Sequence, residues 1–296
     1  MTKIYRVFYE LVVTKDFKIS IIIPTLNRVK YLPRALDSAL NQTFKATEII
    51  VVDNGSSDGT LELIKEKYPL VTLLEESKLG VSAARNKGII SSKSDWVAFL
   101  DSDDAWDNRK LEVQKNALLS NSLNYKLVHT EEIWIKNNIR INQMKKHQKF
   151  GGYIFEKCLP LCCISPSSVL IQKNIFNQVG YFDESLPVCE DYDLWLKICS
   201  KEEVLFIDQK LTFKYGGHND QLSKSFWGMD RFRIKSIENL ILNYDLKSYQ
   251  KHIAIKILIK KILIVINGAH KRKNYSIINE YEKKLNYWEK VVIQLN

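Results

Sequence analysis

Two short acidic clusters contain the residues of this sequence best suited to chemistry. Asp101-Ser102-Asp103-Asp104 follows an apolar run that ends at Leu100, and Glu190-Asp191-Tyr192-Asp193 opens a segment with helical spacing. Two carboxylates two residues apart at a strand end can hold Mg²⁺ together with the oxygens of a diphosphate. A metal placed there would neutralise a departing diphosphate. The alternative is a turn in which an Asp only caps the helix expected near Asn108.

The second cluster also has two interpretations that the residues leave open. A carboxylate in a cleft beside other carboxylates holds a proton more tightly, which suits a carboxylate of this cluster to take the proton of a hydroxyl group. Acidic residues in the first turn of a helix also stabilise that helix through its dipole, without any catalytic role.

Alternating strands and helices would bring these carboxylates to one edge of a sheet. We expect strands over 19–23, 48–52, 70–74 and 96–100, with helices over 31–40, 60–67 and 81–90 between them. This order predicts an α/β fold, with a mostly parallel central sheet and flanking helices. Ligands of such sheets bind beyond the carboxyl ends of the strands, where Asp53 and Asp101 would share one rim.

The rest of the chain divides into an irregular middle and a helical end. The middle predicts helices over 109–119 and 190–200 and strands over 125–129, 133–135, 168–172 and 204–213. Residues 151–168 hold two Pro, two Gly and three Cys, which predicts a long loop over the site. Helices are expected over 229–243, 249–267 and 277–294. We therefore predict an N-terminal extension (1–17), a catalytic domain (18–226) and a basic helical C-terminal region (227–296).

Composition indicates a globular protein with a full core. The 296 residues are 45% hydrophobic and carry a net charge of +10. Lys256, Lys260 and Lys261 interrupt the best candidate for a spanning helix, and residues 1–17 lack the apolar run of a secretion signal. The five cysteines form no C-x-x-C pair and are expected as reduced thiols. We expect a cytoplasmic protein, either free or peripheral on the inner face of the plasma membrane.

Five motifs in order resemble those of the family 2 glycosyltransferases, which have the GT-A fold. The motifs are SIIIPTLNR (20–28), VVDNGSSDGT (51–60), GVSAARNKG (80–88), FLDSDD (99–104) and EDYDLW (190–195). The resemblance covers about residues 18–223. It implies an enzyme that transfers a sugar from a nucleotide-sugar donor with inversion at the anomeric carbon and with help from Mn²⁺ or Mg²⁺.

The resemblance also implies roles for individual residues. Asp101 and Asp103 would form the D-x-D element that binds the metal, with His218 as a further ligand or, alternatively, only a loop histidine. Asp191 would be the base that deprotonates the acceptor hydroxyl. The nucleotide site would consist of Pro24, Thr25, Leu26, Asn27, Arg28, Asp53, Arg85, Asn86, Asp101 and Ser102. Acceptor contacts are expected from Glu190, Trp106, Tyr153 and Trp195, with core packing as the alternative for Trp195.

The resemblance suggests partners as well. A UDP-sugar is the commonest donor in the family, and the expected acceptor is a glycan or lipid-linked glycan in bacterial surface polysaccharide assembly, such as capsule or lipopolysaccharide. The basic C-terminal helices predict either contact with an anionic membrane surface or simple packing on the catalytic domain. Nucleic acid is not expected, because the sequence has no RNA-binding motif and no basic-aromatic platform.

Three other functions agree less well with these residues. A nucleotidyltransferase also uses paired Asp and Mg²⁺, but the first strand leads to Pro24-Thr25-Leu26-Asn27 and not to a Gly-rich basic loop. A catalytically silent nucleotide or glycan binder has no need of both Asp101/Asp103 and Asp191. A dinucleotide oxidoreductase is disfavoured because no G-x-G-x-x-G follows the first strand.

Overall fold

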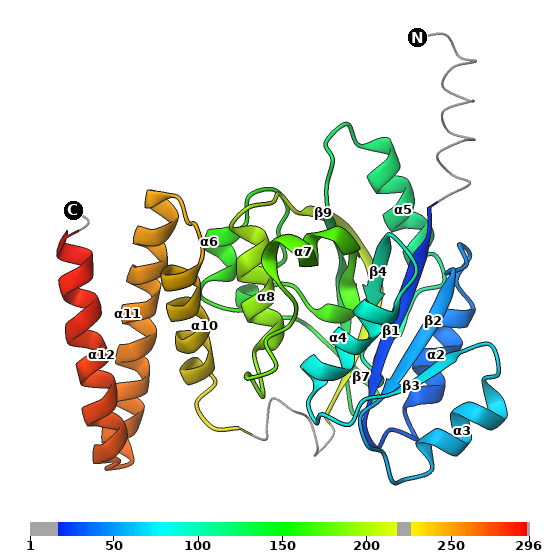
Figure 1. Ribbon diagram of the computed structural model, residues 1–296, viewed down its shortest axis with the longest axis horizontal. Helices are drawn as coiled ribbons and strands as arrows, with labels where there is room; N and C mark the ends of the chain where they lie inside the picture. The colour runs from blue at the N-terminus through cyan, green and yellow to red at the C-terminus, as the bar shows by residue number, and fades with distance from the viewer. Residues whose placement is uncertain (1–16, 218–225, 295–296) are drawn as a thin grey trace.

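The computed structural model, which describes residues 17–217 and 226–294, contains one nine-stranded sheet with helices on both faces (Figure 1). Parallel pairing runs through its first four strands and recurs between β6 and β9, whereas β8, β5 and β7 pair antiparallel. The predicted α/β sheet with flanking helices is confirmed. The strand order is β3 (Thr72–Glu75), β2 (Glu48–Asp53), β1 (Ile19–Thr25), β4 (Trp96–Phe99), β8 (Val169–Gln172), β6 (Leu127–Lys136), β9 (Leu205–Gly216) and β5 (Ala105–Trp106), with β7 (Ile139–Ile141) on β6.

Successive residues of the central strands pack into two different hydrophobic cores, one on each face of the sheet. Ile22 packs into the core on one face of the sheet, while Ile21 and Ile23 pack into the core on the other, because side chains alternate along a strand. All three are fully buried, as expected for a strand covered on both faces. The first face is covered by α4 (Val81–Ser91), α6 (Phe155–Cys158), α7 (Phe176–Val179) and α8 (Glu190–Cys199), and the second by α2 (Leu32–Leu40), α3 (Thr60–Lys67) and α5 (Lys110–Ser120).

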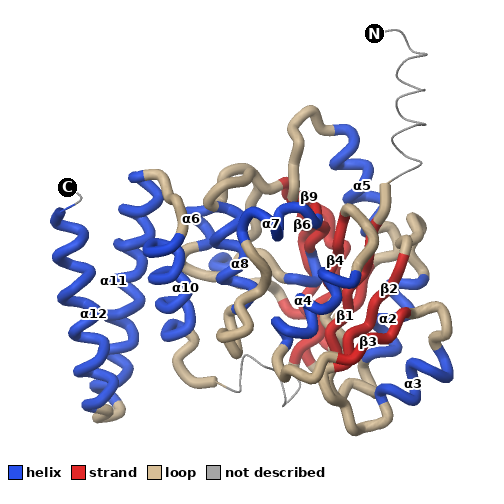
Figure 2. The backbone as a smooth tube through the Cα atoms, in the orientation of Figure 1, coloured by secondary structure: helices blue, strands red, loops and turns tan. Residues whose placement is uncertain are grey.

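Three C-terminal helices extend the first of these cores. The helix α10 (Asp230–Asn243) packs against α8, α11 (Ser248–Lys271) against α10 and α6, and α12 (Tyr275–Gln294) against α11 (Figure 2). Lys261 of α11 reaches inward, where its ammonium donates to the Pro160 carbonyl at 2.8 Å and pairs with Asp230 at 2.9 Å. The packing interpretation of these helices is therefore confirmed.

Contact of the C-terminal helices with an anionic membrane surface stays a prediction, as do the domain boundaries and the cellular location. None of the described helices has both the length and the hydropathy needed to cross a lipid bilayer.

The middle of the chain differs from its prediction in two places. The strands expected over 125–129 and 133–135 form the single strand β6, whose pairing with β9 shifts register on either side of Glu131. The expected loop over 151–168 contains α6 and a 3-10 turn, because Phe155 and Cys158 are apolar side chains buried in the core. The 3-10 turns in the described part of the chain are η1 (Lys145–His147), η2 (Pro166–Ser168) and η3 (Lys173–Ile175).

A glycine lets α4 lie close against β1. A Cβ atom at Gly88 would overlap the side chain of Ile22, so any larger residue must push the helix away from the strand. Arg85 lies one turn earlier on the same helix, and its position therefore depends on this close approach.

Replacing Gly88 by Ala should destabilise the protein. We expect the free energy of unfolding to fall by about 1–3 kcal/mol, the usual effect of overpacking a well-filled core. The matched control is Gly268→Ala in α11, where the new Cβ meets only the end of the flexible Arg272 side chain. There we expect no loss, or a gain of about 0.5–1 kcal/mol from the higher helix propensity of Ala. Urea unfolding curves of wild type and both variants measure these changes in free energy. Equal changes at Gly88 and Gly268 would contradict the close approach of α4 to β1 as the cause.

Candidate active site

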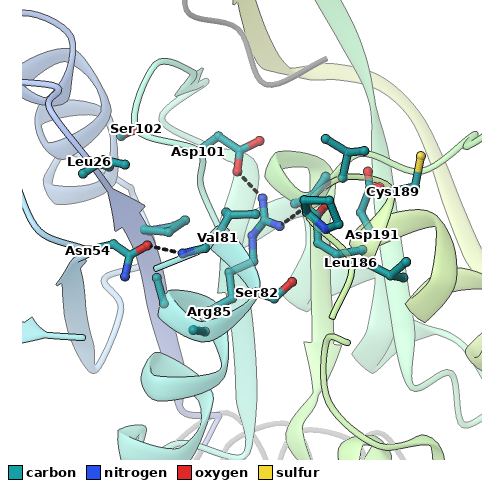
Figure 3. Close-up of a pocket in the computed structure, with 18 of the residues that line it drawn as sticks. Leu26, Asn54, Val81, Ser82, Arg85, Asp101, Ser102, Leu186, Cys189 and Asp191 are labelled. Carbon is teal, nitrogen blue, oxygen red and sulfur yellow. Dashed lines mark hydrogen bonds and ion pairs between the residues drawn. The ribbon is translucent and has the colours of Figure 1, made fainter. Parts of the chain in front are cut away.

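A pocket of about 780 Å³ lies where the carboxyl ends of β1, β2 and β4 face the start of α8 (Figure 3). Leu26 and Asn54 lie at one side of the close-up, Cys189 and Asp191 at the other, and Arg85 between them. The pocket is lined mainly by six segments of the chain, which are 24–28, 79–85, 101–104, 184–192, 214–215 and 226–233.

Arg85 joins the two sides of this pocket through a buried pair of ionic contacts. Its Nη2 donates to Asp101 Oδ1 at 2.7 Å and its Nη1 donates to Glu190 Oε1 at 2.6 Å. The side chain is 4% exposed. Burial alone would lower the pKa of the guanidinium, but the two carboxylates outweigh burial and raise the pKa, so Arg85 stays charged. One helix residue thus fixes the turn after β4 relative to the start of α8.

The acidic turn after β4 is held from behind by hydrogen bonds. The backbone N–H of Asp101 donates to Ser167 Oγ at 3.1 Å, and the Ser167 hydroxyl donates to Asp104 Oδ2 at 2.6 Å. The other oxygen of Asp104 accepts from the Tyr215 N–H of β9 at 3.0 Å. Asp104 is 1% exposed, and burial raises its pKa well above the usual range. Both oxygens of Asp104 are thus used to hold the turn, although Asp104 lines the pocket together with Asp101 and Asp103.

The carboxylates of Asp101 and Asp103 fit a divalent cation. Burial, and then the negative charge of Asp101, raise the pKa of Asp103, so a cation placed between the two would relieve their repulsion. Carboxylate oxygens are ligands that Mg²⁺ and Mn²⁺ prefer. The described residues include no cluster of three or more His, Cys, Asp or Glu that could hold a metal without further ligands, so diphosphate or water oxygens would complete the shell. His218 lies outside the described residues.

Asp191 and Glu190 are neighbours in sequence but differ in what they can reach. The partly buried Asp191 lines the pocket, and its Oδ2 accepts a weak hydrogen bond from Cys162 Sγ at 3.5 Å. Glu190 is only 5% exposed and is bound to Arg85. Burial, and then the charge of Asp191, raise the pKa of Glu190 to about 7 against the opposing effect of Arg85. Asp191 is thus the carboxylate of the pair that is not committed to Arg85.

The opposite side of the pocket is lined by five residues predicted for the nucleotide site, which are Pro24, Thr25, Leu26, Arg28 and Ser102. The Thr25 hydroxyl is buried and has no hydrogen-bond partner within the described part of the chain. A ligand that reaches this wall can therefore satisfy it.

Three predicted nucleotide contacts, Asn27, Asp53 and Asn86, are not among the residues that line the pocket in this structure. Asn27 has a left-handed backbone (φ 53°), and its side-chain oxygen accepts from the Ser57 N–H at 2.8 Å. One Asp53 oxygen accepts from the N–H groups of the following turn, and the other is buried without a partner among the described residues. The Asn86 amide donates to the Phe182 carbonyl at 2.9 Å. In this structure these side chains are hydrogen-bonded to neighbouring segments, and their contact with the nucleotide stays a prediction.

The predicted acceptor contacts also need correction, because three aromatic residues do not line the pocket that the described residues form. Trp195 is 1% exposed, since it lies on the apolar face of α8 that packs into the core. Trp106 is buried, and its N–H donates to the Ser167 carbonyl at 2.7 Å. Tyr153 is 74% exposed, at the surface of the protein. Of the predicted acceptor residues, only Glu190 lines the pocket.

Residues that sequence reasoning missed come from β9 and the start of α10. Lys214 and Tyr215 line the pocket from β9, and Phe226, Met229 and Arg233 line it from the segment that leads into α10. The one feature of the sequence that could have indicated Lys214 is its place between two aromatic residues, in a strand with several buried positions.

Comparison with known proteins gives a consistent result. Residues 20–180 match Glycosyl transferase family 2. An uncharacterized glycosyltransferase of Rickettsia felis is 30% identical over 274 residues, which is 90% of this chain and 44% of that protein. UDP-Glc:alpha-D-GlcNAc-diphosphoundecaprenol beta-1,3-glucosyltransferase WfgD of Escherichia coli is 31% identical over 197 residues, which is 65% of this chain and 74% of that protein. The chain spans less than half the length of the first curated relatives it matches.

Solved structures agree on the fold. The crystal structure of S. aureus TarS 1-349 in complex with UDP-GlcNAc has a TM-score of 0.65 and 18% identity, and the match covers 91% of this chain and 92% of that one. This likeness shows the fold alone, and with the family match it confirms the predicted GT-A class.

The pKa of Glu190 predicts a pH dependence of stability. A carboxyl group whose pKa is higher in the folded protein stabilises the fold fully below the unfolded pKa, and this contribution is lost as the pH rises through the folded pKa. From about pH 4.5 to about pH 7, wild type should lose stability through this group. In Glu190→Gln the side-chain oxygen can still accept a hydrogen bond from Arg85, but the group no longer titrates. The loss in free energy of unfolding across this pH range should therefore be smaller than in wild type by on the order of 1–3 kcal/mol.

Urea unfolding across this pH window tests that expectation. The control is Glu156→Gln on α6, an exposed glutamate whose replacement should leave the wild-type profile unchanged. Parallel profiles for wild type and Glu190→Gln would show that Glu190 does not titrate as described.

Proposed function

The chain belongs to glycosyl transferase family 2, and on that premise we propose that its pocket transfers a sugar from a nucleotide-diphosphate donor to a hydroxyl group of an acceptor. The observation that carries the proposal is the Arg85 bridge, which holds the Asp101/Asp103 turn and the Glu190-Asp191 pair at the two sides of one pocket. A transferase of this kind needs these two functions side by side: one to hold the departing diphosphate and one to accept a proton.

We propose a UDP-sugar as the donor. The solved TarS structure is a complex with UDP-GlcNAc, and the name of the E. coli relative contains UDP-Glc. In this chain the nucleoside would lie along Thr25, Leu26 and Asn54, where the unpartnered Thr25 hydroxyl offers a hydrogen bond. The acceptor would be a glycan or lipid-linked glycan, in assembly of a bacterial surface polysaccharide.

Asp101 and Asp103 would hold Mn²⁺ or Mg²⁺ at the diphosphate. Such an ion supplies positive charge to the leaving diphosphate. Arg85 and Lys214 lower the pKa of Asp101 against the effect of burial, so Asp101 remains an ionised ligand at neutral pH. The role of Arg85 at this end is to fix the position and charge of that carboxylate.

Asp191 would act as the general base of an inverting reaction. The acceptor oxygen forms a bond to C1 of the sugar while the bond from C1 to the diphosphate oxygen breaks, and the acceptor proton passes to Asp191. Glu190 cannot easily take this role, because its carboxylate is bound to Arg85. This arrangement needs no covalent intermediate on the protein.

The two alternatives receive less support. A nucleotidyltransferase is disfavoured by the family match over residues 20–180. A silent binder needs no base, yet Asp191 lines the same pocket as Asp101 and Asp103.

Replacing Asp191 by Asn should remove turnover without removing the donor site. We expect kcat to fall by about 10²–10⁴, the range for loss of one general base, while the affinity for UDP changes by less than about twofold. Sugar-transfer assays and titration calorimetry on the same preparation measure the two quantities. Near wild-type turnover in the variant would remove Asp191 from the proposed role.

Replacing Asp103 by Ala should abolish metal-dependent nucleotide binding. UDP, dTDP, GDP and CDP are titrated into wild type with Mn²⁺ and again with EDTA, and we expect tight binding of one nucleotide only with the metal. The variant should lose at least about tenfold in that affinity, because a hydrogen-bonding or ligand carboxylate is removed. The control is Asp107→Ala, outside the pocket, where Asp107 pairs with Arg109. Metal-independent binding by wild type would contradict the assigned metal site.

A further inference from the structure

Lys214 is a charged pocket residue to which the mechanism above gives no contact with substrate. It lies on β9, opposite Trp134 of β6, and lines the pocket beside Tyr215. Among the described residues, no carboxylate lies within ion-pair distance of its ammonium group. Burial would lower the pKa of Lys214, but the more distant charges of Glu132, Asp104 and Asp101 outweigh burial and raise it. Lys214 is therefore a cation at neutral pH with hydrogen-bond donors to offer.

Two other cations of the pocket are already committed to carboxylates. Both ends of the Arg85 guanidinium are bound, one to Asp101 and one to Glu190. Arg233 is paired with Asp230 at 3.0 Å. Arg28 also lines the pocket and has interactions of its own. Within residues 17–217 and 226–294, Lys214 thus differs from Arg85 and Arg233 in having no carboxylate at ion-pair distance.

Lys214 lines the same pocket as both chemical functions of the proposed reaction, the Asp101/Asp103 turn and Asp191. The positive charge of Lys214 acts to lower the pKa of Asp101 and of Asp103 in the turn after β4. The charge of Asp191 at the start of α8 in turn acts to raise the pKa of Lys214. In the proposed reaction, the bond that breaks lies between these same groups. A diphosphate that enters this space brings several negative charges toward existing carboxylates, and it needs compensating positive charge.

We propose that Lys214 binds the diphosphate of the nucleotide donor through its ammonium group, and that it stabilises the negative charge that collects there as the sugar leaves. The inference rests on the proposed function. When the bond between C1 and the diphosphate oxygen breaks, its electron pair stays on that oxygen, and the acceptor proton goes to Asp191. Lys214 stays protonated throughout and contributes only charge and hydrogen bonds.

Binding measurements on Lys214→Met test this directly, because Met keeps the apolar stem and removes the charge. UDP, UMP and uridine are titrated into wild type and variant by calorimetry with Mn²⁺; if another nucleoside diphosphate binds wild type more tightly, its own series is used. We expect the affinity for the diphosphate to fall by about 10- to 100-fold, as for loss of a hydrogen bond to a charged group. The affinity for UMP should fall much less, and that for uridine should not change.

Two control variants separate charge from structure. Lys214→Arg should restore most of the diphosphate affinity, because it restores the positive charge. Lys210→Met, on the same strand but exposed and outside this pocket, should bind all three ligands as wild type does. Loss of metal would not explain a weaker diphosphate complex, because removal of a nearby cation makes the Asp101/Asp103 site more attractive to a divalent ion.

The possible outcomes are distinct. If Lys214→Met binds the diphosphate as tightly as wild type does, or loses equal affinity for all three ligands, Lys214 has no special role at the diphosphate and the inference is overturned. If wild type binds no nucleotide at all, the proposed function fails and the inference falls with it. A selective loss for the diphosphate, with rescue by Arg, supports both.

Discussion

The buried charge of Arg85 is the constraint on which the rest of the pocket depends. Removing a guanidinium from water costs several kcal/mol, and only close partners of opposite charge offset that cost. The two partners come from segments about ninety residues apart, the turn after β4 and the first turn of α8. If either carboxylate moved away, the buried guanidinium of Arg85 would lose part of the charge that compensates it. The two ion pairs therefore hold both segments against α4. The relative position of Asp101 and Asp191 is a consequence of this balance.

Packing sets where that charge lies. Gly88 lets α4 lie against β1, and the Asn86 amide ties the same helix to the segment that leads toward α8. On the other side of the pocket, the Asn54 side chain accepts from the Gly80 N–H at 2.7 Å, which fixes the start of α4 (Figure 3). The polar residues around the pocket are thus of two kinds: some line it, and others hold the helix that carries Arg85.

Local patterns predicted the elements well, but they could not predict long-range contacts. The strand at 19–25 is a continuous apolar run, and the helix at 32–40 has a clear apolar face. The placement of Asp101 beyond a strand end follows from sheet geometry. Lys214 was missed because β9 reaches the pocket by pairing with β6, about eighty residues earlier, and no local pattern records that pairing. For Trp195 the sequence left two interpretations open, because an aromatic residue on an apolar helix face looks the same whether it packs in the core or stacks on a sugar, and the structure shows core packing. Asn27 and Asp53 were assigned by motif, and no motif predicts that Asn27 accepts from the distant Ser57 N–H while Asp53 accepts from the turn that follows it.

Lys261 of α11 connects the C-terminal helices to the region of the pocket, because it binds both Asp230 of α10 and the carbonyl of Pro160 near Cys162. The side of the pocket that contains Met229 and Arg233 is therefore built partly by the C-terminal helices, whereas the side that contains Thr25 and Asp101 is built by the sheet. The two sides draw on separate stretches of sequence. Over evolutionary time, one side can accumulate substitutions, or be exchanged along with the helices behind it, while the other keeps its original selectivity.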